Sequence, residues 1–170
     1  FPAMGLIVSG GHTELVFIKN FGKYKMIGST RDDAVGEAFD KVAKILGLGY
    51  PGGPAVAREA TKITNYKLQI TNYELPRPMM NSDNFDFSFA GLKTAVLYLV
   101  KKLNEKELKK LTPVICAEFQ QAAVDVLISK TIRAAKKYKV KSVLLGGGVS
   151  ANKELREHLG AAIKKEMPEA

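Results

Sequence analysis

The stretch GLIVSGGHTELVFI, residues 5–18, decides how the fold begins. It holds two short apolar runs, residues 5–9 and 13–18, which are joined through the pair Gly10-Gly11. Short apolar and β-branched runs with glycine-bearing connections are typical of neighbouring strands. A third run of this kind is Tyr24–Ser29. The first 29 residues therefore predict an antiparallel meander of three strands.

A helix is predicted after the meander, because apolar residues then recur at helical spacing. Asp32 or Asp33 is placed to cap its first turn, and Gly47 marks its end. The apolar positions are Val35, Phe39, Val42 and Leu46. The next run, YPGGP at residues 50–54, predicts a rigid loop, since proline fixes φ and glycine frees it. Beyond it, ITNYKLQ (63–69) is followed at once by ITNYELP (70–76), which is identical at five of seven positions. Two copies are too few for a repeat architecture, so they indicate a local duplication in a surface segment.

The second half of the chain alternates between helical and strand patterns. The predicted elements are a strand-like run at 85–89, a helix at 91–103, a helix at 113–138, a strand at 142–145 and a last helix capped by Ser150 or Asn152. A meander followed by alternating helices and strands indicates an α/β fold, the ribonuclease-H-like lobe that the actin, Hsp70 and sugar-kinase ATPases use twice. We expect residues 1–170 to form most of the second such lobe, with an inserted segment at about 51–112. The first lobe and the C-terminal end of the second are then missing from this sequence.

Composition excludes several classes of protein. With 46% hydrophobic and 25% charged residues, the chain has an ordinary globular composition. No apolar run approaches the roughly 20 residues that a membrane span needs. One cysteine, Cys116, excludes a disulfide framework and points to a buried core position. The two histidines, His12 and His158, are too far apart for a local zinc motif.

The chain carries 26 basic and 17 acidic residues, a net charge of +9. Residues 86–170 hold +7 of this excess. A polyanion such as RNA is therefore a candidate partner, and solvated lysine-rich helix faces are the alternative. Because 21 of the 26 basic residues are lysines, base-specific recognition through arginine is not indicated.

Three motifs can bind a nucleotide. Ser9-Gly10-Gly11-His12-Thr13 lies between two strands, where glycine N–H groups and the side chain of His12 can approach a phosphate, although a plain hairpin would look the same. The run GGGVSAN, residues 146–152, leads from a strand into a helix N-terminus, which is a common anion site or simply close helix–strand packing. Glu37 and Asp40 share one helix face, where they can accept from ribose hydroxyls or lie solvated beside lysines.

Taken together, these motifs resemble one family. IVSGGHTELV (7–16), GEAFDKVAKILGLGYPGGP (36–54), PRPM (76–79), FDFSFAGLKTAV (85–96) and GGGVSANKELR (146–156) occur in the order seen in the tRNA N6-adenosine threonylcarbamoyltransferase family, formerly described as O-sialoglycoprotein endopeptidases. The resemblance implies an acyltransferase of tRNA modification. It moves a threonylcarbamoyl group from threonylcarbamoyl adenylate to N6 of the adenosine beside the anticodon, in tRNAs that read codons beginning with adenine.

The resemblance also implies which residues bind substrate. The family's VSGG loop corresponds to Ile7, Val8, Ser9, Gly10 and Gly11, and its other ligand-binding positions correspond to Asp40 with its neighbour Glu37, to Gly53 and to Asn152. Ile7 stands where archaeal and eukaryotic members carry Tyr, which indicates the bacterial branch. Ala57 stands where some members place a Glu near the ribose. No catalytic residue is assigned.

Cofactor and partners follow from the same resemblance. A divalent metal, iron, is expected with ligands outside this chain, because neither the family's HxxxH pair nor its CTDN-like motif occurs here. The nucleotide ligand is the adenylate or ATP. Expected partners are tRNA, threonylcarbamoyl adenylate, a paralogous subunit and an ATPase subunit, in the cytoplasm and without a membrane. The alternatives are an ATP-binding actin-like scaffold subunit and a sugar-kinase-like protein, neither with transferase activity.

Overall fold

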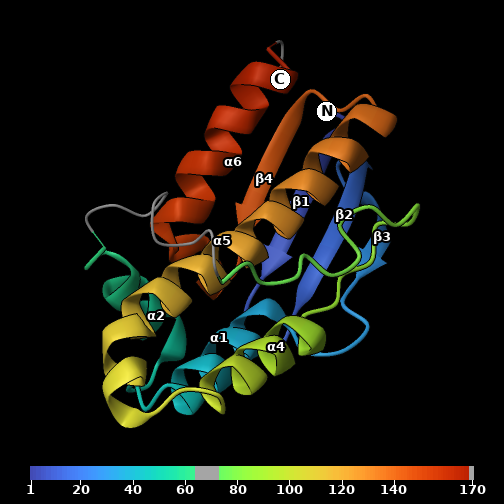
Figure 1. The fold of residues 1–170 in the computed structure, drawn as a ribbon. Helices are drawn as coiled ribbons and strands as arrows, with labels where there is room; N and C mark the ends of the chain where they lie inside the picture. Colours follow the sequence, from blue (N-terminus) through green and yellow to red (C-terminus); the bar gives the residue numbers. More distant parts are fainter. Residues whose placement is uncertain (64–72, 169–170) are drawn as a thin grey trace.

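The computed structural model describes residues 1–63 and 73–168. Four strands form one sheet in the order β3-β2-β1-β4. They are β1 (Ala3–Val8), β2 (Thr13–Asn20), β3 (Lys23–Ser29) and β4 (Ser142–Gly146). The first three pair antiparallel, which confirms the meander, whereas β4 lies parallel to β1. β1 and β4 therefore end at the same edge of the sheet (Figure 1).

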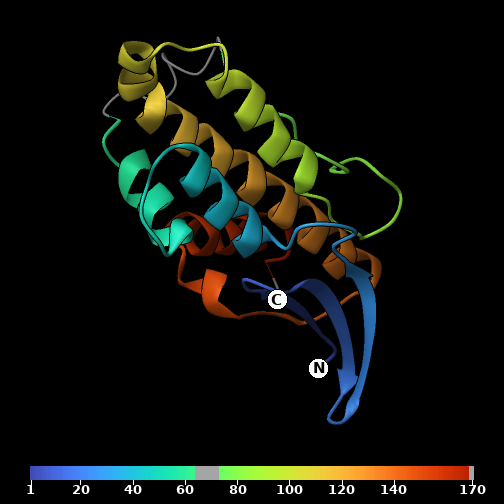
Figure 2. The ribbon, with the colours of Figure 1, turned by 90° about the horizontal axis from the view of Figure 1, so that it is seen from below.

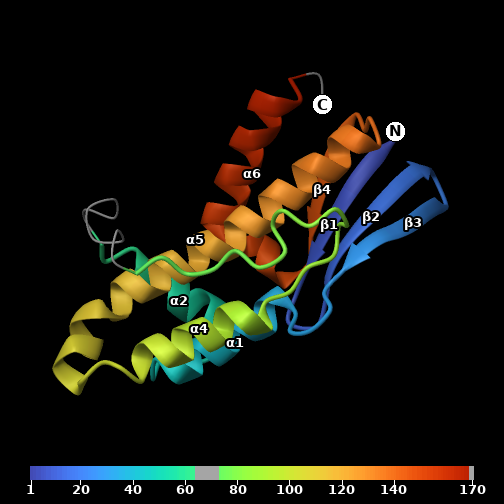
Figure 3. The same ribbon diagram turned by 45° about the vertical axis from the view of Figure 1, so that its right-hand side comes forward.

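Helices lie along the sheet and beyond this edge. They are α1 (Val35–Ile45), α2 (Gly52–Ala60), α4 (Ala90–Val100), α5 (Glu105–Lys137) and α6 (Lys153–Glu166), with a short 3-10 helix η2 (Gly148–Ala151) before α6. α5 runs across one face of the sheet with α6 beside it, and α1, α2 and α4 gather where β1 and β4 end (Figures 1 and 3). Seen from below, the β2–β3 hairpin extends away from the helices (Figure 2). The order of elements is that of the predicted α/β lobe.

The core lies between the sheet and α5. Alternate residues of β1, namely Met4, Leu6 and Val8, are fully buried, as the two-residue period of a strand requires. α5 passes a length and composition criterion for a membrane span, with an 18-residue window of mean hydropathy 1.3, but 72% of that window is buried in the fold. The apolar residues of α5 therefore serve the core, and Cys116 is buried among them as predicted.

Three predicted boundaries are wrong. The rigid loop at 50–54 is only partly a loop, because α2 begins at Gly52. Pro54 lies in its first turn, where a proline costs no intrahelical hydrogen bond. The long helix begins at Glu105 rather than Pro113, since Asn104 and Glu107 form a capping box upstream of the proline. The helix predicted at 91–103 is confirmed as α4, with its end three residues earlier.

The predicted strand at 85–89 forms only an isolated bridge, between Thr30 and Phe87. The alternating Phe85, Phe87 and Phe89 are all buried, so the pattern reflects core packing without strand pairing. Most of the ITNY duplication lies outside the described residues. The region predicted as an insertion, 51–112, contains α2 and α4 in its described part.

The predicted cap of α1 is also wrong. The N-cap residue of α1 is Ala34, which makes no side-chain capping bond. The hydroxyl of Thr13, a fully buried residue on β2, accepts the N–H of Val35 at 2.8 Å instead. The two aspartates act elsewhere: Asp32 receives backbone N–H groups at the start of α4, and Asp33 pairs with lysines.

Candidate functional site

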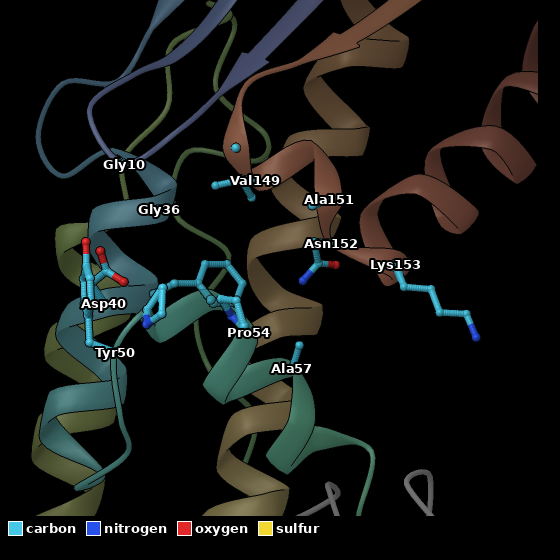
Figure 4. A pocket seen from close by; sticks show the side chains of 14 residues that line it. Gly10, Gly36, Asp40, Tyr50, Pro54, Ala57, Val149, Ala151, Asn152 and Lys153 are labelled. Carbon is cyan, nitrogen blue, oxygen red and sulfur yellow. The ribbon is translucent and has the colours of Figure 1, made fainter.

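A cavity of about 510 Å³ opens beyond the ends of β1 and β4. Its walls come from the loop after β1, from α1, from the start of α2 and from the η2–α6 junction (Figure 4). The residues around it are Gly10, Gly36, Phe39, Asp40, Tyr50, Pro51, Gly53, Pro54, Ala57, Gly148, Val149, Ala151, Asn152 and Lys153. In open α/β sheets, ligands commonly bind just beyond the carboxyl ends of the parallel strands, which is where this cavity lies.

The loop after β1 is held closed by Ser9. Its hydroxyl accepts the N–H groups of Gly11 at 3.2 Å and His12 at 3.0 Å, and its own N–H donates to the His12 carbonyl at 2.8 Å. The backbone N–H groups of Gly11 and His12 lie in the loop that was predicted to approach a phosphate, but both are hydrogen-bonded to the Ser9 hydroxyl. Gly10 is the residue of this loop that lines the cavity, while His12 is exposed with Nδ1 3.5 Å from the Ser9 hydroxyl.

The start of α1 is docked directly on this loop. The N–H of Gly36 donates to the Ser9 carbonyl at 3.2 Å, beside the bond from Val35 to Thr13. A Cβ on Gly36 would lie 2.5 Å from the same carbonyl oxygen, which is far inside van der Waals contact. Glycine at this position is therefore a packing requirement, and it fixes the loop relative to α1.

Asp40 connects α1 to α2 along one wall of the cavity. Its Oδ1 accepts the N–H of Gly52, the first residue of α2, at 2.7 Å. A Cβ on Gly52 would lie 2.5 Å from the Asp40 Cα, so the two helices approach too closely for any other residue. Gly53, which follows, lines the cavity with open space at its Cα. The second carboxylate oxygen of Asp40 remains available to accept from a ligand.

Glu37 lies outside the main cavity. Its carboxylate pairs with Lys41 at 2.8 Å, and with Asp40 it lines a neighbouring hollow of about 470 Å³. Lys41 also contacts Asp33, and Lys93 of α4 reaches the other oxygen of Asp33 at 3.0 Å. Burial alone would raise the pKa of Asp33, but the hydrogen bonds from the two lysines outweigh it and hold that pKa below its usual value. These pairs attach α1 to α4 behind the cavity.

The run of glycines after β4 carries the opposite wall. Gly147 has a φ of 93°, and a Cβ there would lie 2.2 Å from the carbonyl oxygen of Val8. This contact brings η2 against the end of β1. Asn152 then caps α6 as predicted, since its Oδ1 accepts the N–H of Leu155 at 3.0 Å. The alternative cap, Ser150, lies within η2.

The structure thus brings together four of the predicted substrate-binding residues: Gly10, Asp40, Gly53 and Asn152. Val8 is buried in the core, and Ile7 is half-buried in β1 opposite Glu14, and neither residue lines the cavity. Ser9, Gly11 and His12 build the loop without lining the cavity. Three further lining residues, Tyr50, Val149 and Lys153, were not predicted as site residues, although they lie within the quoted runs 50–54 and 146–156.

A metal site does not assemble from the described residues. In the ranges 1–63 and 73–168, no three His, Cys, Asp or Glu side chains lie close enough together to hold an ion. The buried thiol of Cys116 has a pKa raised to about 12, chiefly by burial, which disfavours the thiolate that a metal would need. The expected iron thus finds no ligand set in this part of the chain, and its ligands elsewhere remain a prediction.

Comparison with known proteins gives a consistent result. A family model described as tRNA N6-adenosine threonylcarbamoyltransferase matches residues 1–169. The chain is 51% identical over 168 residues to the protein of that name from Ralstonia pickettii, covering 97% of this chain and 47% of that protein. It is 46% identical to the protein of that name from Enterococcus faecalis, covering 99% of this chain. The chain therefore spans about half the length of the curated relatives it matches.

Among solved structures, component A of (R)-2-hydroxyglutaryl-CoA dehydratase from Acidaminococcus fermentans superimposes with a TM-score of 0.51 at 17% identity. The match covers 95% of this chain and 52% of that one. At this identity the likeness concerns the fold, which is the actin-like ATPase fold predicted from the order of elements. On its family model and its curated relatives, this chain belongs to the tRNA N6-adenosine threonylcarbamoyltransferase family.

Proposed function

We propose that this chain supplies the nucleotide-binding part of a transferase that moves a threonylcarbamoyl group from threonylcarbamoyl adenylate to N6 of the adenosine beside the anticodon. The relatives at 46–51% identity carry the name of this activity. Partner proteins, a paralogous subunit and an ATPase subunit, and a cytoplasmic location belong to the same proposal.

One observation carries the proposal. Gly10, Asp40, Gly53 and Asn152 come from four separate motifs, and all four line a single cavity. Its volume of about 510 Å³ suits a small-molecule ligand such as a nucleotide. A carboxylate stands on one wall and a carboxamide at a helix start on the other (Figure 4). Carboxylate oxygens accept from ribose hydroxyls, and a helix N-terminus favours a phosphate or another acceptor.

The chemistry suits a site that binds and orients. The N6 amine of adenosine attacks the carbamoyl carbon, a C–N bond forms, the bond from that carbon to the phosphate oxygen breaks, and AMP leaves while the amine loses a proton. Because the donor is already activated, correct placement of donor and acceptor contributes a large part of the rate. A bound divalent metal would polarise the acyl group or the leaving phosphate. The residues described here contribute binding and orientation.

The test is tRNA modification and nucleotide binding by the same variants. We expect Asp40→Ala and Asn152→Ala to weaken adenylate binding by roughly 1–3 kcal/mol each, because each removes a hydrogen-bonding group from the cavity. Calorimetry measures the affinity, and mass spectrometry of digested tRNA measures the modification. The exposed Asp83→Ala is the matched control. Unchanged affinity in both cavity variants, or no modification by a full-length protein that contains this chain, supplied with adenylate and partner proteins, would contradict the proposal. Residues 1–170 alone are expected to be inactive, because the activity belongs to a protein of about twice this length.

A further inference from the structure

A hydrogen bond from the backbone fixes which way round the side-chain amide of Asn152 lies. The backbone N–H of Leu155 lies 3.0 Å from Oδ1. A backbone N–H can only donate, so the atom facing it must be the carbonyl oxygen of the amide. This removes the usual ambiguity between the oxygen and nitrogen of an asparagine. Nδ2 must then point away from the helix.

A glutamine on another helix receives this nitrogen. Gln120 of α5 is 6% exposed, and its Oε1 accepts from Asn152 Nδ2 at 2.8 Å. The two residues are 32 positions apart. Because Nδ2 is a donor, the buried amide of Gln120 must present its oxygen to it. The cap and the glutamine together hold both polar atoms of Asn152.

The group that Asn152 presents to the cavity is a donor. One of the two Nδ2 hydrogens is taken by Gln120 and the other is left for a ligand, while the oxygen, which accepts from Leu155, lies toward α6. Asn152 lines the cavity, and Figure 4 shows its nitrogen on the side of the cavity and its oxygen on the side of α6. Asp40, on the opposite wall, can only accept when ionised. The cavity therefore has a donor on one wall and an acceptor on the other.

We propose that Gln120 is a positioning residue that fixes Asn152 as a hydrogen-bond donor to the cavity. The ligand group recognised by Asn152 is then an acceptor, such as a ring nitrogen of a purine or a ribose oxygen, and not an amino or hydroxyl donor. This inference rests on the proposed function, since it takes a nucleotide as the ligand. Beyond that function, the inference states that Asn152 donates to the ligand, and it assigns a positioning role to Gln120, which does not line the cavity.

The first test reverses the polarity without changing the cap. Asn152→Asp keeps an oxygen for the N–H of Leu155, and aspartate caps helices as well as asparagine does. The amide of Gln120 can rotate to donate to the second oxygen. The group facing the cavity then becomes an acceptor. We expect AMP affinity, measured by calorimetry on the purified protein, to fall about tenfold or more while the melting temperature is unchanged.

The second test asks whether Gln120 acts through Asn152. Gln120→Met keeps the size and removes the acceptor, and we expect a several-fold loss of AMP affinity. Gln120→Glu restores an acceptor oxygen and should recover most of that loss. In the Asn152→Asp background, Gln120→Met should cause no further loss of AMP affinity, because the Asn152 amide that Gln120 orients is already absent.

Three outcomes overturn the inference. They are an Asn152→Asp protein that binds AMP like wild type, losses that add fully in the double variant, and absence of AMP binding by the wild-type protein. The proposed function is judged separately by tRNA modification. Wild-type modification with additive losses contradicts only the role of Gln120, whereas the expected pattern of AMP affinities without any modification contradicts only the proposed reaction.

Discussion

The carboxylate of Asp32 accepts the backbone N–H of Phe89 at 2.8 Å, although 57 residues separate them. The same oxygen accepts the N–H of Ala90 at 3.1 Å, and Oδ2 accepts from the hydroxyl of Ser88. Asp32 thus caps α4, whose own N-cap residue, Phe89, makes no side-chain capping bond. The contact joins the connection before α1 to the start of a helix in the second half of the chain.

Removal of this cap should destabilise the whole domain. We expect Asp32→Ala to lower the free energy of unfolding by about 1–2 kcal/mol, because α4 loses the acceptor for two N–H groups. Asp32→Asn keeps an acceptor oxygen and should retain most of the stability. Urea unfolding followed by circular dichroism measures the difference, and the exposed Asp83→Ala is the control. Equal stability of Asp32→Ala and wild type would show that water replaces the cap without cost.

The two glycines after β4, Gly147 and Gly148, should differ sharply in their tolerance of substitution. Gly147 has a φ of 93° and no room for a Cβ beside the Val8 carbonyl, so Gly147→Ala should cost about 2 kcal/mol or more of stability. A Cβ on Gly148 meets open space, and Gly148→Ala should change stability by no more than about 0.5 kcal/mol. Denaturant unfolding of both variants provides the comparison. Equal effects at the two positions would contradict the close approach of η2 to β1.

Lys130 makes stability depend on pH in the alkaline range. It is fully buried on α5, where its Nζ donates to the Ser82 hydroxyl at 2.8 Å and the Asn84 carbonyl at 3.1 Å. Burial, followed by the nearby Arg133, lowers its pKa from 10.5 to about 8. Between these values the unfolded chain holds a proton that the folded protein has lost. Stability from this residue therefore rises as pH increases from about 8 to 10.5.

The measurement is the free energy of unfolding of wild type minus that of Lys130→Met, followed through this pH range. The difference should shift in favour of wild type by about 3 kcal/mol, since each pKa unit corresponds to about 1.4 kcal/mol. Because both proteins share all other titrating groups, the contributions of those groups to the pH dependence cancel in this difference. The same comparison with Lys110→Met, an exposed lysine, should stay flat. A flat difference for Lys130→Met would mean that its ammonium is solvated in the folded protein.

The lysine excess of the second half should appear in the salt dependence of tRNA binding. The connection between α4 and α5 and the first turns of α5 carry five exposed lysines: Lys101, Lys102, Lys106, Lys109 and Lys110. Lysines that bind phosphates release counterions, so affinity should fall steeply with salt. Replacing Lys101, Lys102 and Lys106 by Gln should reduce the slope of log K against log salt by about one for each phosphate that a replaced lysine had neutralised.

Filter binding at several salt concentrations measures this slope. The matched control replaces Lys19, Lys23 and Lys25 of the β2–β3 hairpin by Gln, which removes the same charge from the first half. A shallow slope for the wild-type protein, or a weakening confined to the hairpin variant, would show that the lysines of the second half are a solvated face.

The sequence alone determined the elements whose signals are local. The short apolar runs at residues 5–9 and 13–18 and the glycine connection at Gly10-Gly11 are properties of neighbouring residues, and the meander followed from them. The cap of Asn152 on Leu155 spans three positions, so it too could be predicted. The motifs that carry Gly10, Asp40 and Asn152 were visible in the sequence as candidate nucleotide-binding runs, whereas Gly53 was indicated only by the family resemblance.

Only the tertiary structure decided which side chains meet across long separations. Asp32 is a good capping residue by type, but the helix that it caps is chosen by packing across 57 positions, and α1 receives Thr13 instead. Glu37 and Asp40 share a helix face, yet only Asp40 lines the main cavity, while Glu37 lines the neighbouring hollow. The polarity of Asn152 depends on Gln120, 32 positions away. A local pattern fixes periodicity and short-range hydrogen bonds, whereas these contacts depend on how whole elements pack.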